Sequence, residues 1–205
     1  LNLGFFSSHG GSNMQAIVES CKKGTLNANP CLVISNNPDA NALVFAKKEG
    51  IPTAILNSKI YPDPDNLDKA ILDTLKNHNV DLIVLAGYMR MLGKRTLDYY
   101  KNRILNIHPA LLPKYGGKGM YGMFVHEAVI KAKEKVSGVT IHLVDEEYDH
   151  GAIIAQSQVP VLEDDTPESL KERVLKEEHK FFSEVLQKVA SGEIDLEKIQ
   201  QSHIV

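Results

Sequence analysis

Several features that mark particular classes of protein are scarce or missing in this sequence of 205 residues. It has no Trp, only 6% aromatic residues and a net charge of −3, which argues against nucleobase stacking and against attraction to nucleic acid or an anionic membrane. No apolar run approaches the length of a membrane span, and the N-terminus lacks the pattern of a signal peptide. We therefore expect a cytoplasmic protein whose partners are neither nucleic acids nor membranes.

Cysteine is also scarce, and its spacing gives no sign of a metal site. Cys21 and Cys31 are the two cysteines, and neither belongs to a CxxC or a Cys/His ligand pattern. We expect two free, largely buried thiols in a reducing compartment, and no bound metal.

The order of the apolar patterns predicts an α/β fold. Strand-like runs over 3–7, 31–35, 53–56 and 82–87 alternate with helical patterns over 14–23, 40–49, 67–78 and 94–100, and a further strand begins at Ile104. This order is typical of a doubly wound, mostly parallel sheet. After it we expect a loop over 114–122, a helix over 125–133, an antiparallel extension over 137–144 and 152–159, and a long C-terminal helix from Thr166. The sequence predicts one domain, 1–205, with a nucleotide- or phosphate-binding half, 1–100, and a catalytic half, 101–205.

A glycine-rich turn follows the first predicted strand. Gly11, Ser12 and Asn13 lie where a helix begins, and strand, turn and helix in this order place backbone N–H groups around a phosphate. We expect Ser12 or Asn13 to cap that helix. The third glycine of a dinucleotide fingerprint is missing, and Ser35-Asn36-Asn37 stands where an acidic residue would bind a ribose. The turn therefore favours a monophosphate, and a plain strand-to-helix turn is the alternative.

Two polar residues alternate at the end of the strand that begins at Ile104. Asn106 and His108 fall on one face, and Leu105 and Ile107 fall on the other. His can transfer a proton near neutral pH, and Asn can donate to a developing oxyanion. The alternative is a core histidine bound to a backbone carbonyl.

Acidic residues stand at two further positions of interest. Glu178 falls near the middle of an apolar stripe on the last helix, where a carboxylate needs a salt bridge or a role in a site. Asp149 lies in an acidic connection, 145–151, that is long for a hairpin. Separately, the apolar segment 88–93 after a buried strand is suited to a flat heteroaromatic ligand or to plain packing.

An Asn, a His and an Asp together suit direct acyl transfer to an amine. Asn and imidazolium can stabilise a tetrahedral oxyanion, while the carboxylate holds the imidazole and accepts the proton of the amine. Neither a GxSxG nor a Cys/His signature is present, which disfavours a covalent acyl-enzyme.

The motif Asn106-x-His108-Pro109-x-Leu111-Leu112-Pro113, with Asp149 before Gly151, resembles the active site of the folate-dependent formyltransferases. The segments 11–13, 85–90 and 178–179 narrow the resemblance to members that formylate glycinamide ribonucleotide in de novo purine biosynthesis. The resemblance covers nearly the whole chain and implies a Rossmann-like formyltransferase fold with 10-formyltetrahydrofolate as co-substrate. It implies catalytic roles for Asn106, His108 and Asp149, phosphate binding by Gly11, Ser12 and Asn13, and substrate binding by Glu178. It also implies that folate contacts Met89, Arg90, Met91, Leu92, Val144, Asp145 and Tyr148.

The sequence departs from the family pattern at four places. Leu175 stands where relatives can carry a polar residue, and His150 and Gly116 stand where many have Gly or Ala and Pro, respectively. The segment 62–65 lacks the basic residue that some relatives use for the glutamate tail of folate. The resemblance therefore leaves the residue that binds this tail open.

Three other functions share parts of this pattern. A methionyl-tRNA formyltransferase would need a tRNA-binding domain, for which we expect no room in 205 residues. A formyltetrahydrofolate hydrolase would need no phosphate loop. A non-enzymatic nucleotide-binding module would leave Asn106, His108 and Asp149 without a role. We expect small-molecule substrates and a monomer or weak homodimer.

Overall fold

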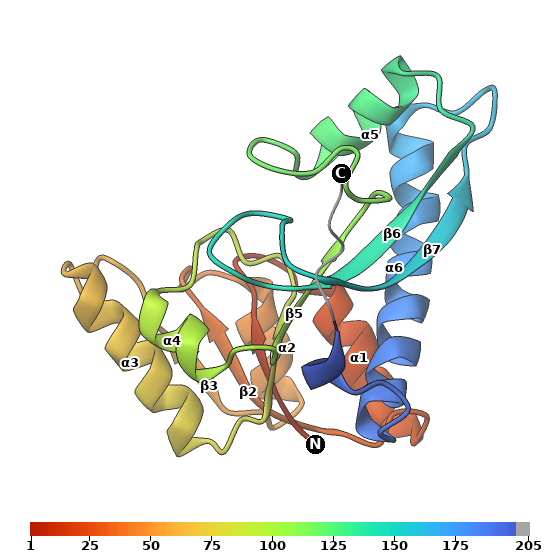
Figure 1. Ribbon diagram of the computed structural model, residues 1–205. Helices are drawn as coiled ribbons and strands as arrows, with labels where there is room; N and C mark the ends of the chain where they lie inside the picture. Colours follow the sequence, from red (N-terminus) through yellow and green to blue (C-terminus); the bar gives the residue numbers. More distant parts are fainter. Residues whose placement is uncertain (200–205) are drawn as a thin grey trace.

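A seven-stranded sheet forms the centre of the molecule (Figure 1), whose computed structural model describes residues 1–199. The strand order is β3-β2-β1-β4-β5-β6-β7, in which β1 to β5 are parallel and β6 and β7 are antiparallel. The strands are β1 (Asn2–Phe6), β2 (Asn29–Ser35), β3 (Thr53–Ile55), β4 (Leu82–Leu85), β5 (Ile104–His108), β6 (Val136–Leu143) and β7 (Ile153–Pro160). The predicted fold class, with its antiparallel extension, is confirmed.

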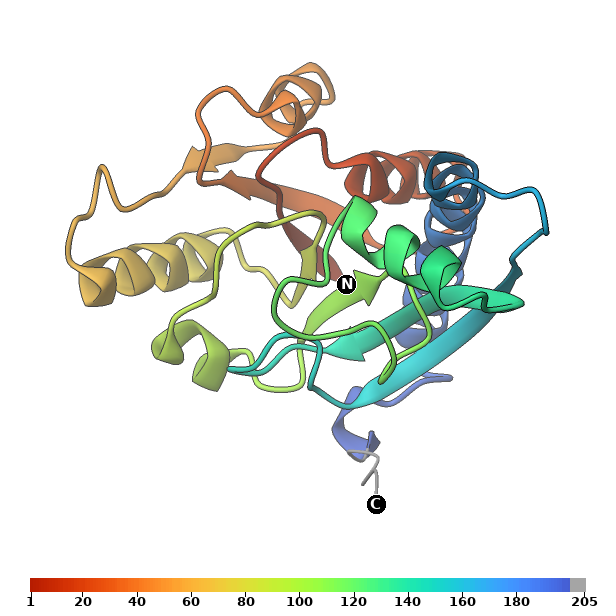
Figure 2. The same ribbon diagram turned by 90° about the horizontal axis from the view of Figure 1, so that it is seen from above.

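Helices cover both faces of this sheet, as Figures 1 and 2 show. Strand alternation divides the core: Leu3 and Phe5 of β1 pack on the side of α1 and α6, and Phe6 packs on the side of α3. The helices are α1 (Ser12–Lys23), α2 (Asn41–Lys48), α3 (Pro64–Asn77), α4 (Lys94–Tyr99), α5 (Met123–Lys131) and α6 (Pro167–Ala190), followed by a 3₁₀ turn, η1 (Leu196–Lys198). The long last helix is confirmed, and Thr166 caps it by accepting a hydrogen bond from the Ser169 N–H.

Two helix starts differ from the expectation. Gly11 adopts a left-handed conformation, φ 65°, so α1 begins directly at Ser12 without a side-chain cap, and the expected capping by Ser12 or Asn13 is wrong. The third helix begins at Pro64, not at Leu67, because the Asp63 side chain accepts a hydrogen bond from the Asp65 N–H at 2.9 Å. The N–H groups at the start of α1 are thus left to an external acceptor.

The cysteines are free, as predicted, but the expectation that they are largely buried is wrong. Cys21 lies in the last turns of α1 and Cys31 lies near the beginning of β2, and both are partly exposed because packing is incomplete at the ends of these elements.

The carboxyl ends of β1 and β4 form the switch point of the topology. The chain leaves β1 toward β2 on one side, and β4 leads toward β5 on the other. The Ser8 N–H donates to the Gly87 carbonyl at 3.0 Å, and the Met89 N–H donates to Ser8 Oγ at 2.8 Å. The loops that follow the two strands are therefore joined where open α/β sheets bind their ligands.

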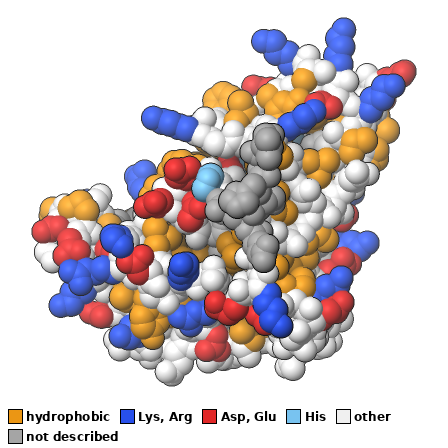
Figure 3. Space-filling model, in the orientation of Figure 1, with side chains coloured by type: hydrophobic (Ala, Val, Ile, Leu, Met, Phe, Trp, Pro, Cys, Tyr) orange, Lys and Arg blue, Asp and Glu red, His pale blue; other side chains and the backbone are white. Residues whose placement is uncertain are grey.

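Charged side chains are mixed on the surface. On the face shown in Figure 3, Lys and Arg side chains are interspersed with Asp and Glu side chains. Within residues 1–199, none of the helices combines the length and the apolar character that crossing a bilayer requires.

Candidate active site

The end of β5 presents the two polar residues that the sequence singles out. Leu105 and Ile107 are buried in the core on the side of α6, whereas Asn106 and His108 point to the opposite face. His108 is only 4% exposed, so its ring nitrogens must find partners within the protein. The predicted alternation along β5 is confirmed.

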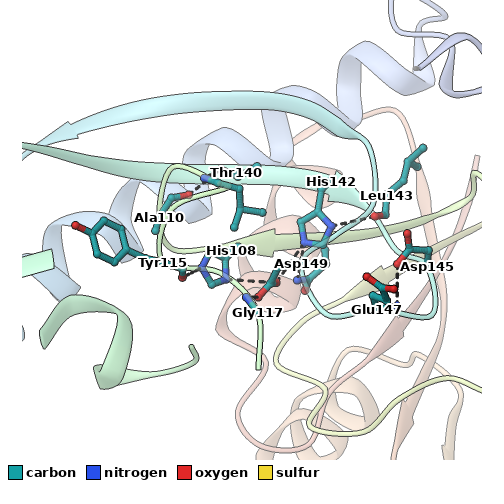
Figure 4. A network of polar contacts seen from close by, with 12 residues as sticks. His108, Ala110, Tyr115, Gly117, Thr140, His142, Leu143, Asp145, Glu147 and Asp149 are labelled. Atoms are coloured by element: carbon teal, nitrogen blue, oxygen red, sulfur yellow. Dashed lines mark hydrogen bonds and ion pairs between the residues drawn. The ribbon is translucent and has the colours of Figure 1, made fainter. Parts of the chain in front are cut away.

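Both ring nitrogens of His108 face oxygen acceptors (Figure 4). Nε2 lies 2.6 Å from the Tyr115 carbonyl oxygen, which can only accept, so Nε2 carries a proton and donates it. Nδ1 lies 3.4 Å from Asp149 Oδ1. A ring that carries protons on both nitrogens would donate to both of these oxygen atoms.

Asp149 reaches His108 because two loops hold it over the end of β5. Its backbone is left-handed, φ 54°, a conformation that Asp tolerates better than most residues. Its Oδ2 accepts a hydrogen bond from the Gly117 N–H at 3.0 Å. At Gly151, a Cβ atom would overlap the carbonyl oxygen of Leu143, so only glycine lets the loop pack this closely.

His142 is a member of the site that the sequence analysis missed. The antiparallel register places it opposite Asn106, and its side chain is 2% exposed. Its Nδ1 donates to the Leu143 carbonyl at 2.9 Å, and its Nε2 accepts from Asn106 Nδ2 at 3.2 Å and lies 3.7 Å from Asp149 Oδ1. Burial lowers the pKa of His142, which is consistent with a neutral ring. The alternation along β6 could have placed Thr140 and His142 on one face of that strand, but not beside Asn106.

Thr140 holds the turn that follows His108. Its Oγ1 donates to the Ala110 carbonyl at 2.7 Å and accepts from the Leu112 N–H at 3.0 Å. Gln156 of β7 donates both to Thr140 Oγ1 and to the Leu112 carbonyl, each at 2.9 Å. The antiparallel strands thereby fix the path of the chain beyond β5.

The glycine-rich turn meets α6 at a second polar group. Asn13 Nδ2 donates to Glu178 Oε1 at 3.2 Å, and His179 Nε2 lies 3.1 Å from Ser12 Oγ. Glu178 is 8% exposed, and burial raises the pKa of its carboxyl to about 7, against the opposing effects of the Asn13 hydrogen bond and the charge of Lys171. The structure therefore places Gly11, Ser12, Asn13 and Glu178 together.

The residues expected to bind folate line two adjoining clefts, with two exceptions. Met91, Leu92, Val144 and Asp145 line a cleft of about 590 Å³. Arg90, with Met91 and Tyr88, lines a smaller one of about 180 Å³. Met89 and Tyr148 are exposed and line neither cleft. The Met89 backbone N–H is bound to Ser8 Oγ.

Three of the four departures from the family pattern have a local explanation. A Cβ atom at Gly116 would overlap the Leu112 side chain, so this turn suits glycine. The His150 Nδ1 lies 2.7 Å from Asp145 Oδ2 and braces the loop that carries Asp149. Asp65 forms a bidentate pair with Arg95, at 2.8 and 2.9 Å. Leu175 of α6 is partly buried, and no contact explains its identity.

The fold and the site together define a class of protein. A doubly wound sheet carries a buried His–Asp contact, an amide donor beside it and a helix N-terminus open to an anion. These features are typical of proteins that transfer a chemical group by acid–base chemistry. Within residues 1–199, no group of three or more His, Cys, Asp or Glu side chains is arranged to hold a metal.

Comparison with known sequences gives the family. The profile described as formyl transferase matches residues 1–186, and the chain belongs to this family. It is 44% identical, over 90% of its length, to the chloroplastic phosphoribosylglycinamide formyltransferase of Arabidopsis thaliana, and spans 63% of that relative. It is 39% identical, over 91% of its length, to phosphoribosylglycinamide formyltransferase of Haemophilus influenzae, of which it spans 85%.

A solved structure agrees with the sequence relatives. The crystal structure of phosphoribosylglycinamide formyltransferase from Bacillus halodurans matches 95% of this chain and 97% of that one, with a TM-score of 0.86 and 38% identity. The chain thus spans less than two thirds of its plant relative and nearly all of this bacterial one.

Proposed function

We propose that this protein transfers the formyl group of 10-formyltetrahydrofolate to the amine of glycinamide ribonucleotide, a step of de novo purine biosynthesis. The observation that carries the proposal is the contact of His108 Nδ1 with Asp149 Oδ1, at 3.4 Å, beside Asn106. These three residues are those that direct acyl transfer to an amine requires. The names of the relatives supply the acceptor and the formyl group, and the resemblance of the motif around His108 implies the folate donor.

The residues divide the work of the reaction among them. The amine attacks the formyl carbon, and the carbonyl oxygen becomes an oxyanion. Asn106 donates one amide hydrogen to His142 and retains the other for that oxyanion. The His108 imidazolium, held between Asp149 and the Tyr115 carbonyl, supplies positive charge beside it. Asp149 accepts the proton that the amine loses, directly or through a water molecule. When the oxyanion collapses, the bond between the formyl carbon and the folate nitrogen breaks, and this nitrogen takes up that proton, so that tetrahydrofolate leaves and the formyl group stays on the amine.

The two substrates bind to different loops around the reaction centre. The phosphate of the ribonucleotide binds to the N–H groups of Gly11, Ser12 and Asn13 at the start of α1, where the helix dipole favours an anion. Glu178 contacts the same substrate beside Asn13. Folate binds between the segments 89–92 and 144–148, where Leu92 and Val144 offer apolar surface to the pterin.

A turnover assay tests this function against its alternatives. Purified protein is given 10-formyltetrahydrofolate with and without glycinamide ribonucleotide, and formylated product and free formate are both measured. Product formation that requires the ribonucleotide supports the proposal. Formate release without the ribonucleotide would instead indicate a hydrolase, and no turnover would indicate a binding module. Asp149→Asn serves as the matched inactive control.

We also propose that the enzyme acts in the cytoplasm as a monomer or weak homodimer, without a metal or a nucleic-acid partner. The net charge of −3 supports the absence of a nucleic-acid partner. Sedimentation at several protein concentrations measures the oligomeric state.

A further inference from the structure

The carbonyl group that holds His108 belongs to a residue in an uncommon backbone conformation. Tyr115 is left-handed, φ 58°, which few residues with a bulky side chain adopt. Its carbonyl oxygen lies 2.6 Å from His108 Nε2, and two residues later the Gly117 N–H donates to Asp149 Oδ2 at 3.0 Å. The turn 115–117 therefore contacts both members of the His–Asp pair, and other contacts must hold it in this conformation.

The side chain of Tyr115 is anchored on the side away from His108. Figure 4 shows that the Tyr115 ring points away from the imidazole, while the Tyr115 carbonyl faces it. The Tyr115 hydroxyl donates to Glu134 Oε1 at 2.8 Å. This hydrogen bond joins the turn 115–117 to the segment between α5 and β6.

Glu134 is itself tied to the core of the molecule. It follows α5 and precedes β6, and its backbone N–H donates to the carbonyl of Val129, a fully buried residue of α5, at 3.3 Å. The carbonyl of the next residue, Lys135, accepts a hydrogen bond from the Val161 N–H at 3.0 Å. The carboxylate that binds Tyr115 therefore extends from a segment that is held at both ends.

The carboxylate of Glu134 is charged, which strengthens the hydrogen bond from Tyr115. Hydrogen bonds from the Tyr115 hydroxyl and from Lys114 lower the pKa of Glu134. Burial, assisted by the bond to Glu134, raises the pKa of Tyr115, so the proton stays on the phenol and is donated to an ionised acceptor. Lys114 Nζ lies 3.4 Å from the same oxygen, but its side chain is 71% exposed, so this ion pair contributes little.

Glu134 lies away from the groups proposed to bind the substrates. Tyr115 and Glu134 line one cleft, of about 290 Å³, together with Lys114 and Ser137. That cleft shares no lining residue with the two clefts that carry residues expected to bind folate, and none with the turn 11–13. We therefore expect a change at Glu134 to alter catalysis and not the binding of either substrate.

We propose that Glu134 is a positioning residue for His108. By binding the Tyr115 hydroxyl, it holds the left-handed turn in place, and the Tyr115 carbonyl then fixes the His108 ring with Nδ1 toward Asp149. This inference rests on the proposed function, because it explains how the histidine of that reaction is oriented. Without the carboxylate, the turn relaxes from its strained conformation, and His108 Nε2 loses its fixed acceptor.

The kinetic test compares variants of Glu134 and Tyr115 with a control at Glu127. Glu134→Ala and Tyr115→Phe should each lower kcat about tenfold or more, with KM values within about twofold, because misplacing a catalytic group is costly. The double variant should be no worse than the poorer single variant, since each removes the same bond. Glu134→Gln keeps an oxygen acceptor and should retain most of the kcat.

Glu127→Ala is the matched control. Glu127 is exposed on α5, and its side chain forms no hydrogen bond or ion pair within the part of the chain that the structure describes, 1–199. Its loss removes one carboxylate from the same region without touching Tyr115. We expect the kcat of Glu127→Ala to equal that of the unmodified protein.

A spectroscopic readout tests the link to His108 without formyl transfer. The His108 ring is 4% exposed and its Nε2 proton is donated to a carbonyl, so this proton should exchange slowly with water. It should give an imidazole proton resonance that His108→Ala lacks. The resonance should persist in Glu127→Ala and Glu134→Gln, and it should broaden or vanish in Glu134→Ala and Tyr115→Phe.

The outcomes separate this inference from the proposed function. A normal kcat in Glu134→Ala, or a lowered kcat with the His108 resonance unchanged, would overturn the role of Glu134 and leave formyl transfer intact. A lower Tm with kcat and resonance unchanged would likewise overturn it, since Glu134 would then serve the fold alone. Loss of the resonance in Glu134→Ala, in a protein that transfers no formyl group, would support the link to His108 and overturn the proposed function alone.

Discussion

At the scale of residues, the orientation of the side chains in the site follows from backbone carbonyls, which can only accept hydrogen bonds. The Tyr115 and Leu143 carbonyls only accept, so His108 Nε2 and His142 Nδ1 must donate. With its Nδ1 protonated, neutral His142 offers Nε2 as an acceptor, which orients the Asn106 amide with its Nδ2 toward the ring. Asn106 is therefore preorganised as a donor before any substrate binds.

The first prediction concerns this donor. Asn106→Ala should lower kcat by about 10²–10³, the usual effect of losing one oxyanion hydrogen bond. Asn106→Asp keeps the shape but offers an acceptor in place of the donor, so its kcat should fall at least as far. Single-turnover formyl transfer measures both. An Asn106→Ala protein with nearly normal kcat would show that the amide does not stabilise the oxyanion.

The second prediction concerns the carboxyl of Glu178, whose pKa in the folded protein is raised to about 7 by burial. Because the folded state retains a proton that the unfolded state has released, this group lowers stability as the pH rises from about 4.5 to about 7. Glu178→Gln should therefore match the unmodified protein in Tm near pH 5. At pH 8 it should be more stable, by on the order of 3 kcal/mol.

The kinetic effect of Glu178→Gln separates a role in the substrate site from a structural one. If Glu178 contacts the substrate, the variant should raise the KM for glycinamide ribonucleotide at pH 8 despite its greater stability. A variant with normal KM and a large loss of Tm would mean that Glu178 serves the fold. Melting curves and initial rates at pH 5 and pH 8 give both quantities.

The two histidines of the site differ in how far the sequence predicts them. His108 lies on one strand with Asn106, and local alternation places both on one face. His142 comes beside Asn106 only through the register of β5 with β6, which no local pattern specifies. The role of Asp149 is what the resemblance to the family implies, and the geometry of its contact with His108 depends on a loop conformation that the sequence does not reveal.

At the scale of elements, the connection between β6 and β7 does more than reverse the chain. The register of the two strands shifts between Ile141 and His142, and the loop then folds back so that Asp149 meets His108. Its close approach to the end of β6 depends on Gly151, where a side chain has no space. In the sequence, Asp63 and Pro64 are typical of a helix start and could have predicted where α3 begins. The loop between β6 and β7 has no sequence pattern that predicts its conformation as strongly.

The third prediction tests that close approach. Gly151→Ala places a Cβ atom on the Leu143 carbonyl oxygen, so the loop must shift. We expect a loss of about 1–3 kcal/mol in stability, typical of overpacking, and a lower kcat because Asp149 moves. Thermal melting and initial rates measure these effects. Gly10→Ala is the matched control for Tm, since a Cβ there has no neighbour within 4 Å, and an equal loss of Tm in both variants would contradict the explanation.

At the scale of the whole molecule, the sheet topology determines which distant segments form one site. The switch point between β1 and β4 joins the glycine-rich turn after β1 to the segment after β4, and the antiparallel β6 and β7 carry Asp149 to the end of β5. The alternation of strands and helices predicts this fold because each element has its own local pattern. The walls of the cleft proposed to bind folate are less predictable, since Met89 and Tyr148 lie outside it.

The last prediction tests whether this topology makes His108 and Asp149 one functional unit. Each of His108→Ala and Asp149→Asn should lower kcat by about 10²–10⁴, the contribution of a positioned acid–base group. Because each residue acts through the other across 3.4 Å, the double variant should be little worse than the poorer single variant.

His78→Ala, combined with Asp149→Asn, is the control pair. His78 ends α3 and is bound to the Thr74 carbonyl, so its small effect should simply multiply with that of Asp149→Asn. The rates of formyl transfer of all the single and double variants show whether the two effects multiply. Multiplicative losses for His108 and Asp149 would mean that the two residues act independently and that Asp149 does not work through the imidazolium.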